Sequence, residues 1–598
     1  MGRQREERDR RNGSQPEQSR ISKRMVFRRT VILMLICGVG FFIPLMVQLW
    51  NISIQDHDFY QQKAAEQQLM DVAVAAHRGD ILDANGEVMA MSATVYNLIL
   101  APKDLINSVD KDDFEDEDGK LDQSAYQAEI QRKRDEVADG LCAIRPDLDR
   151  ADLERRLEKE NSQYEVLLTN VEEGEAESIR AFIEENKTAY YLYLTPSTKR
   201  YYPFSALASQ VLGFVNTEGG VYGLEAGYED VLKGIPGRVV TGKTAKNVEM
   251  YNSYSNYIDA VNGYDLTLTL DSTIQAYAEQ AIETGIQAYD VRNGGFCVVM
   301  DPKTGAVLAM ASSPDFNPND YDEILDADTQ AELDALKEQY GADSEEYASV
   351  WNEAYNRQLR NKALSDTYEP GSTFKALVLA AALEEGVVSE SDTFYCSGSV
   401  KIAHHTIHCS KVTGHGSQTL AEAVQNSCNP AFMMIGQRLG AEKFYDYFEA
   451  FGMTEVTGID LPGEEKGQDW GREYITSLEG YLSLATASFG QRFTVTPLQM
   501  ITAFSAVING GNLYQPYVVQ SITDASGAVL QNTEPTLTRQ VISQESSDRA
   551  RAILESVVSE GTGGNAYQAG YRIGGKTGSS ETDEEGRTIV SFMGFAPA

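Results

Sequence analysis

The segment EPGSTFK (369–375) stands directly before the apolar run ALVLAAALEEG (376–386). Its Pro-Gly pair interrupts the preceding structure, and the apolar run predicts a buried helix. Ser372 therefore falls in the first turn of this helix, with Lys375 one turn later on the same face. A serine hydroxyl becomes a nucleophile when a nearby base takes its proton, and a lysine with a lowered pKa can be that base. The helix N-terminus adds backbone N–H groups that can hold an oxyanion.

A second candidate segment is Ser427-Cys428-Asn429, which stands before the helical run AFMMIGQRLG. It matters because Ser-x-x-Lys alone occurs often by chance. The simpler interpretation of the tripeptide is a polar helix cap. In the functional interpretation Ser427 passes a proton near Lys375, and Asn429 binds a substrate amide. Cys428 is expected to be a small buried hydrophobic residue rather than a nucleophile.

A third candidate segment is IGGKTGSS, which contains Lys576, Thr577, Gly578 and Ser579. Glycines weaken a strand unless another backbone approaches it closely, and a peptide substrate that adds itself as a strand would be such a backbone. Lys576 would then supply positive charge for a terminal carboxylate, and the two hydroxyls would donate hydrogen bonds. An earlier Lys-Thr-Gly at 303–305 lies in a predicted hairpin turn and is interpreted as a turn only.

In this order and in these contexts, the three segments resemble the motif set of the penicillin-binding protein and serine β-lactamase superfamily. HRGDILDANGEVMA (77–90), the segment 200–237 and TPLQMITAFSAVINGG (496–511) are similar to the class B, or monofunctional, penicillin-binding proteins. The similarity covers nearly all of the chain after residue 70. The stretch 395–416 most resembles the division and sporulation group.

The resemblance implies an α+β protein with a single N-terminal transmembrane helix, a β-rich pedestal domain of the dimerisation type and a transpeptidase domain. The last resembles serine β-lactamases, with an antiparallel sheet flanked by helices. The expected bounds are 1–29 for a cytoplasmic basic tail, 30–50 for the anchor, 56–260 for the pedestal and 263–598 for the transpeptidase domain. Because the family normally continues with another strand and a terminal helix, we expect the transpeptidase domain to be truncated at its C-terminus.

The resemblance also implies a peptidoglycan D,D-transpeptidase that works without a cofactor. Ser372 would attack the carbonyl between the terminal D-alanines of a wall stem peptide and form an acyl-enzyme, which an amine of a neighbouring strand converts into a cross-link. Lys375 is the expected base, and the N–H groups of Ser372 and Ser579 the expected oxyanion hole. β-Lactams would acylate Ser372. The expected catalytic residues are Ser372, Lys375 and Ser427, and the expected substrate-binding residues are Asn429, Lys576, Thr577, Gly578 and Ser579.

Two positions depart from the pattern of the resembled family. Ser579 stands where a threonine usually follows Lys-Thr-Gly, and it keeps the hydroxyl. GQRF (490–493) replaces the commoner Gly-Gln-Gly, with no effect that the sequence alone defines.

Charge is distributed unevenly along the chain. Residues 1–29 carry ten Lys/Arg against four Asp/Glu, a net charge of +6. Because the whole chain has a net charge of −38, residues 30–598 carry −44. Such an acidic chain lacks the basic surface that DNA or RNA binding requires, so nucleic acid is excluded as a partner. The stretch 30–55 is uncharged, and its apolar part, 31–50, is long enough for a hydrocarbon core of about 30 Å. The basic flank predicts a cytoplasmic N-terminus with the rest outside, and a cleavable signal peptide is the competing interpretation.

The histidine-rich stretch 404–409 ends in a cysteine, with Cys396 and His415 nearby. Three states stay open: a disulfide between Cys396 and Cys409, unpaired thiols in a loop, or a zinc site. The irregular spacing and the outside location make a metal the least expected of the three, so no metal site is assigned.

Expected partners are peptidoglycan stem peptides, β-lactams and other membrane proteins of wall synthesis, such as a polymerising glycosyltransferase. Three alternative functions use the same motifs. A β-lactamase needs an added glutamate-activated water, for which no clear segment follows Asn429. A β-lactam-sensing receptor normally has several membrane spans, and a purely structural protein would carry the motifs unused. The pedestal and the single apolar stretch favour the transpeptidase.

Overall fold

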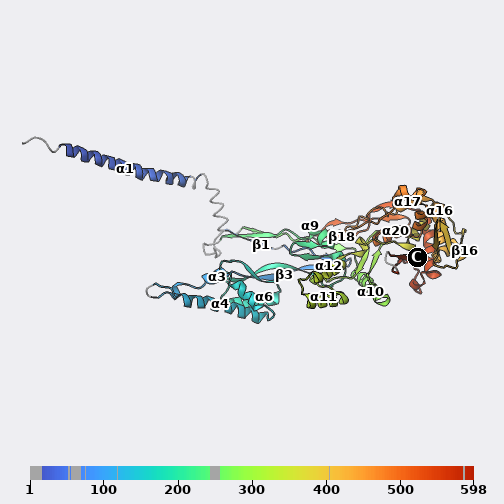
Figure 1. Cartoon of the computed structure of the whole chain (residues 1–598), viewed down its shortest axis with the longest axis horizontal. Coiled ribbons are helices and arrows are strands. Elements are labelled where there is room, and N and C mark those ends of the chain that lie inside the picture. The colour runs from blue at the N-terminus through green and yellow to red at the C-terminus, as the bar shows by residue number, and fades with distance from the viewer. Residues whose placement is uncertain are drawn as a thin grey trace, which may run out of the picture. The chain divides into compact units, whose positions relative to one another are not determined.

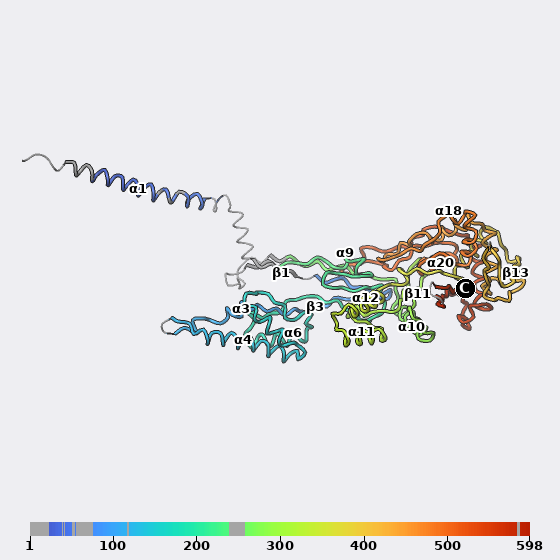
Figure 2. The backbone as a smooth tube through the Cα atoms, in the orientation of Figure 1, coloured from blue at the N-terminus to red at the C-terminus, as the bar shows by residue number. Residues whose placement is uncertain are grey.

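The computed structural model describes residues 17–50, 54, 69–74, 76–116, 119–242, 256–402, 404–582 and 586–598. The chain divides into two compact units, one made of Met1–Val74 with Gly237–Asp259 and the other of Ala75–Pro236 with Ala260–Ala598. Figure 1 colours the elements of both units by residue number, and Figure 2 shows the same path as a tube.

Helix α1 (Glu17–Trp50) belongs to the first unit and contains the whole apolar stretch that was expected to anchor the chain. The helix also includes part of the expected basic tail, because arginine, lysine and glutamine are good helix formers. The apolar side chains described on this helix from Met25 onward are exposed; Phe27 is 70% and Met34 74% exposed. Within the part of the chain that the structure describes, no helix combines the length and the apolarity needed to cross a membrane.

Three antiparallel strands complete the first unit. They lie in the order β1-β8-β9, with Leu69 opposite Gly242. The strands are β1 (Leu69–Val74), β8 (Gly237–Gly242) and β9 (Asn256–Ile258).

A seven-stranded sheet runs through the second unit in the order β19-β18-β10-β2-β3-β4, and β5 also pairs with β3. Strand β10 pairs with β2 in parallel, so strands from either side of residue 263 join one sheet. The apolar residues of β10 alternate with polar ones and only the apolar ones are buried, as the sequence predicts. The strands are β2 (Ile81–Leu82), β3 (Val88–Leu100), β4 (Glu165–Val171), β5 (Leu192–Tyr201), β10 (Asp265–Leu268), β18 (Val519–Thr523) and β19 (Val529–Asn532).

The segment RGDILDANGEVMA (78–90) has an Asn-Gly turn between two strand-like runs, which predicts a hairpin, and the structure confirms it. Ile81 lies opposite Ala90, and Asp83 N–H donates to the Glu87 carbonyl across the turn. Gly86 takes a φ of +87°, a conformation that glycine adopts without steric cost. The Asn-Gly pair therefore forms the turn, because glycine can adopt the positive φ that the turn requires.

A layer of helices covers one end of this sheet and buries its own apolar core. The stretch 123–185 is charged and rich in helix-favouring residues, a composition that predicts helix, but strand β4 interrupts it. The reason is tertiary: Leu167 and Leu168 of β4 are buried where the strand pairs with β3. The helices are α3 (Pro102–Asn107), η2 (Asp112–Phe114), α4 (Gln123–Ile144), α5 (Arg150–Leu157) and α6 (Glu173–Glu185).

A buried ionic cluster ties three separate segments of the second unit together. Glu225 is fully buried and accepts hydrogen bonds from Arg78 Nε at 2.6 Å and from Arg200 Nε at 2.7 Å. Breaking one partner of such a cluster would leave an uncompensated buried charge, at a cost of about 3–5 kcal/mol. The surrounding elements are α7 (Ser209–Leu212), β6 (Phe214–Asn216), β7 (Gly219–Val221), α8 (Gly223–Gly227) and α9 (Glu229–Leu232).

The predicted hairpin of the 294–312 segment is also confirmed: β11 and β12 pair antiparallel around a turn at 301–305. Helix α10 packs on this pair, and Figure 2 shows α10 near β11. The stretch 321–350 is acidic and rich in helix-favouring residues, and most of it lies in helices α11 and α12. The bounds are α10 (Ser272–Tyr289), β11 (Gly295–Met300), β12 (Val307–Ser313), η3 (Pro318–Asp320), α11 (Ala327–Tyr340), α12 (Glu345–Leu359) and α13 (Lys362–Ser365).

The helix predicted after EPGSTFK is the centre of the largest core. It starts as the 3₁₀ turn η4 and continues as α14, in which every residue from Lys375 to Leu383 is buried. Helices from four later segments surround it. The bounds are η4 (Gly371–Phe374), α14 (Lys375–Glu384), α15 (Leu420–Gln425), α16 (Asn429–Leu439), α17 (Ala441–Ala450), α18 (Arg472–Ile475), α19 (Tyr481–Ala487), α20 (Pro497–Ile508), α21 (Gln544–Ser559) and η5 (Gly564–Ala566).

The expected antiparallel sheet of this part is present as separate strand pairs among the described residues. Strands β11–β12 and β21–β22 form two such pairs, and both contribute side chains to the core around α14. Each pair is stabilised by packing one apolar face against helices. The two pairs therefore contribute to one hydrophobic core although no backbone hydrogen bonds of a sheet connect them. The remaining strands are β13 (Thr393–Cys396), β14 (Ser399–Ile402), β15 (His405–His408), β16 (Gly416–Thr419), β17 (Asn512–Tyr514), β20 (Leu537–Gln540), β21 (Gly574–Glu581) and β22 (Thr588–Phe595).

Candidate active site

Ser372 lies in the 3₁₀ turn η4 and is partly exposed, whereas the residues on both sides of it are buried. The turn needs a glycine at its start: Gly371 has a φ of +54°, and a Cβ there would lie 2.6 Å from the carbonyl oxygen of Ser579. Among the described residues, no hydrogen bond reaches the Ser372 hydroxyl. The turn therefore places the Ser372 hydroxyl near strand β21, and no described residue forms a hydrogen bond with this hydroxyl.

The GQRF segment supports the turn of Ser372 from behind, a role that the sequence did not reveal. Gly371 N–H donates to the Gly490 carbonyl at 2.9 Å, and a Cβ on Gly490 would lie 1.9 Å from the Gly371 carbonyl oxygen. Arg492 N–H donates to Glu369 Oε1 at 2.8 Å. Phe493 packs edge-on against Phe374, with ring centroids 4.8 Å apart. The glycine at 490 was the only signal of this close approach.

Lys375 is fully buried, and its Nζ donates three hydrogen bonds. The acceptors are Ser427 O at 2.8 Å, Ser427 Oγ at 3.1 Å and Asn429 Oδ1 at 2.7 Å. Burial, and then the positive charge of Lys576, hold the pKa of Lys375 well below its usual value. An ammonium has the three N–H groups that these bonds need, whereas a neutral amine has two. In the neutral form the two N–H groups stay with the two carbonyl-type acceptors, which cannot donate, so the donation to Ser427 Oγ is lost and the lone pair is left for a hydroxyl.

Ser427 lies between the two lysines and accepts a hydrogen bond from each. Its Oγ lies 3.1 Å from Lys375 Nζ and 3.0 Å from Lys576 Nζ. The residue has a φ of +49°, in the left-handed region that costs a non-glycine residue about 1–3 kcal/mol. This conformation turns both its carbonyl and its hydroxyl toward Lys375. A hydroxyl that accepts twice still has its own proton free to donate.

Lys576 lies on strand β21 and is fully buried, so it does not present its ammonium at the surface. Its Nζ donates to Ser427 Oγ at 3.0 Å and to the Thr577 carbonyl at 2.9 Å. Burial lowers the pKa of Lys576 to about 7. The partly exposed Thr577 and the exposed Ser579 follow it along the same strand. The hydroxyls of this strand, rather than the lysine itself, are therefore accessible.

Asn429 connects the network to a neighbouring loop. Its Oδ1 accepts from Lys375, and its Nδ2 donates to the His408 carbonyl at 3.3 Å. Gly578 adjoins the turn of Ser372, since a Cβ there would lie 2.9 Å from Thr373 Cγ2. The structure thus joins Lys375, Ser427, Asn429 and Lys576 by hydrogen bonds, and brings Ser372 beside Gly578 and Ser579 through backbone packing.

Residues 295–598 match the transpeptidase domain of penicillin binding proteins, and residues 73–268 match the penicillin-binding protein dimerisation domain. The chain is 34% identical over 579 residues to Stage V sporulation protein D of Bacillus subtilis, a match that covers 96% of this chain and 80% of that protein. It is 28% identical over 554 residues to penicillin-binding protein PbpB of Mycobacterium tuberculosis, with 90% and 74% covered.

A solved structure with the same fold is the D,D-transpeptidase domain of peptidoglycan glycosyltransferase from Eggerthella lenta. It is 25% identical, with a TM-score of 0.56, and 88% of this chain and 91% of that chain are covered. The similarity predicted from the motifs is thereby confirmed over both domains. This chain belongs to the family of penicillin-binding proteins that carry a dimerisation domain before a transpeptidase domain.

Proposed function

We propose that the chain is a peptidoglycan D,D-transpeptidase that cross-links stem peptides through an acyl-enzyme on Ser372. The observation that carries this proposal is the convergence of Lys375 and Lys576 on the Ser427 hydroxyl, with Asn429 bound to Lys375, beside the turn that presents Ser372. Both the family and the name of the Eggerthella lenta domain support this reaction class.

Acylation begins when Lys375, in its neutral form, takes the proton of the Ser372 hydroxyl. The hydroxyl oxygen then attacks the carbonyl between the terminal D-alanines, and the carbonyl oxygen becomes an oxyanion. The N–H groups of Ser372 and Ser579 would hold this oxyanion, a role supported by the close contact between Gly371 and the Ser579 backbone. The C–N bond breaks, and D-alanine leaves with a proton.

Ser427 is the residue suited to deliver that proton. It accepts hydrogen bonds from both lysines, so its own proton points away from them, and Lys375 can replace the proton once it is given up. An amine of a second stem peptide then attacks the ester, and the same groups act in reverse. Ser372 is regenerated, and a new amide bond joins the two peptides.

Strand β21 is the expected platform for the donor peptide. It pairs with β22 on one edge, and the described strands contain no partner for its other edge. A peptide can add itself there as a further strand. The hydroxyls of Thr577 and Ser579 would bind its terminal carboxylate, Lys576 would add positive charge from behind, and Asn429 would bind a substrate amide.

The two Lys-Thr-Gly segments provide a matched test of the binding proposal. Lys576→Met should lower kcat/KM for a D-Ala-D-Ala peptide by about 10²-fold, because a positive charge near the carboxylate is lost. The loss should be much smaller for a peptide amidated at that carboxylate. Lys303→Met, in the exposed hairpin turn, should leave both rates unchanged. An equal loss for both peptides in Lys576→Met would contradict a carboxylate-binding role. D-alanine release from purified protein is the measurement.

We further propose that residues 30–50 hold the chain at the cell membrane, with the N-terminus cytoplasmic and the catalytic part outside. The uncharged stretch, its basic flank and the exposed apolar side chains of α1 support this placement. The protein should then resist alkaline carbonate extraction, and protease added to intact cells without an outer wall should reach residues after 56. Release by carbonate would contradict the anchor. The pedestal is expected to contact a membrane glycosyltransferase, and failure of the intact anchored protein to co-purify with one counts against that contact.

A further inference from the structure

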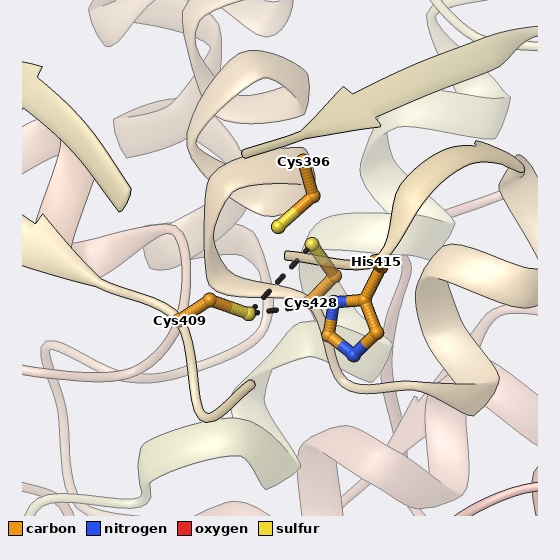
Figure 3. Close-up of side chains that lie close together, drawn as sticks. All are labelled: Cys396, Cys409, His415 and Cys428. Carbon is orange, nitrogen blue, oxygen red and sulfur yellow. Dashed lines mark hydrogen bonds between the residues drawn. The ribbon is translucent and has the colours of Figure 1, made fainter. Parts of the chain in front are cut away.

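Three thiols and one imidazole meet in one cluster, as Figure 3 shows. One of the thiols belongs to Cys428, which directly follows Ser427 of the proposed active site. Their ligand atoms all lie within 4.8 Å of one another. The sulfur of Cys409 lies 3.5 Å from His415 Nδ1 and 4.0 Å from the sulfur of Cys428. The thiols of Cys396, Cys409 and Cys428 are free, and all three residues are buried.

We propose that Cys396, Cys409, His415 and Cys428 form a structural zinc site. A tetrahedral zinc with three thiolates and one imidazole places a sulfur and a nitrogen about 3.5 Å apart and two sulfurs about 3.8 Å apart, given Zn–S and Zn–N bonds of about 2.3 and 2.0 Å. The 3.5 Å between Cys409 sulfur and His415 Nδ1 equals the expected separation, and the 4.0 Å between the sulfurs of Cys409 and Cys428 is slightly longer. No ligand atom lies more than 4.8 Å from another, so small side-chain shifts would close the cluster around the ion. Four protein ligands leave no open position, which is the arrangement of structural rather than catalytic zinc.

The backbone brings the four ligands together without help from a metal. Strand β13 pairs with β16 so that Cys396 lies opposite Gly416, directly beside His415. Gly414 has a φ of +83°, and a Cβ there would lie 2.5 Å from the Cys396 carbonyl oxygen, so this loop packs on Cys396 backbone to backbone. The Cys409 N–H donates to the Gly398 carbonyl at 2.9 Å. The site is therefore organised by strand pairing and close backbone contacts.

The fourth ligand belongs to the Ser-x-Asn segment itself. Cys428 lies between Ser427, which accepts from both lysines, and Asn429, which accepts from Lys375. A zinc ion bound to Cys428 would hold Ser427 in its left-handed conformation and connect it to the loop that carries Cys409. This consequence for catalysis rests on the proposed function, whereas zinc binding does not.

Zinc content of the full-length protein, purified in detergent without added chelator, tests the site directly. We expect about one zinc ion per chain by mass spectrometry of metals, and its loss in His415→Ala and Cys396→Ser. Cys297→Ser is the matched control, because Cys297 lies on β11 outside the cluster. If the variants fold poorly, the second test uses wild-type protein from which the metal has been removed and to which Co²⁺ is added. Absorption bands of thiolate-to-cobalt charge transfer would then support the site.

Two results would overturn the proposal. One is wild-type protein without zinc in which Co²⁺ produces no thiolate bands. The other is a thiol count that falls by two under native conditions, with mass spectrometry locating a Cys409–Cys428 disulfide, since these sulfurs are 4.0 Å apart.

The effect of zinc on the active site has its own measurement. Removing zinc should lower the Tm and slow acylation by a fluorescent penicillin about tenfold, since Ser427 loses its support. Unchanged acylation and Tm after removal would contradict the connection to Ser427. A zinc-loaded protein that penicillin does not acylate at all would instead refute the proposed function and leave the metal site standing.

Discussion

Ser372→Ala should abolish covalent labelling by fluorescent penicillin while the protein stays folded. In the proposed mechanism the label is an ester on the Ser372 oxygen, so alanine removes the atom that would form the bond. Among the described residues this hydroxyl has no hydrogen-bond partner, so its removal should change the free energy of unfolding by less than about 0.5 kcal/mol. Gel fluorescence after denaturation measures the label, and thermal unfolding measures the stability.

A matched serine makes this result specific. Ser391→Ala, at an exposed position outside the network, should label like the wild type. Persistent labelling of Ser372→Ala would place the nucleophile elsewhere. The wild-type label should also be long-lived, and steady hydrolysis of nitrocefin by the wild type would favour a β-lactamase. Full activity of Ser372→Ala in cells would favour the structural alternative.

Lys375→Arg should lower the rate constant of penicillin acylation by about 10²–10⁴-fold. A guanidinium stays charged at every working pH, so it cannot accept the Ser372 proton. Lys303→Arg is the control, because this exposed lysine lies in the hairpin turn. Stopped-flow acylation of wild type and both variants decides the point. An arginine variant that acylates at the wild-type rate would show that another group is the base.

The proposal that Lys375 is the base also predicts the direction in which the acylation rate changes with pH. Only neutral Lys375 can accept a proton, so the rate should rise with pH and level off well below 10.5, because burial and Lys576 lower its pKa. Lys576→Met removes the positive charge, so the rising part of the profile should move to higher pH. A profile of Lys576→Met that moves to lower pH, or does not move, would contradict this electrostatic coupling.

Local patterns predicted the elements that depend on neighbours in sequence. The hairpin at 78–90 follows from its Asn-Gly turn, and the helix after EPGSTFK follows from its apolar run. The strand at 165–171 was not predicted, because its charged and helix-favouring surroundings concealed two buried leucines that only the pairing with β3 explains. The supporting role of Gly490 was equally hidden, since a single glycine does not reveal which backbone approaches it.

The sequence by itself determined which residues could carry the chemistry and in what order, because Ser-x-x-Lys, Ser-x-Asn and Lys-Thr-Gly each depend on spacing within one turn or strand. Tertiary structure alone decided that Lys576, 149 positions along the chain from Ser427, donates to the same Ser427 hydroxyl as Lys375. It also decided that Lys576 is buried rather than presented, and that Cys428 meets Cys396, Cys409 and His415. Burial and long-range contact depend on how distant segments pack, and the pKa values and ligand geometry follow from that packing.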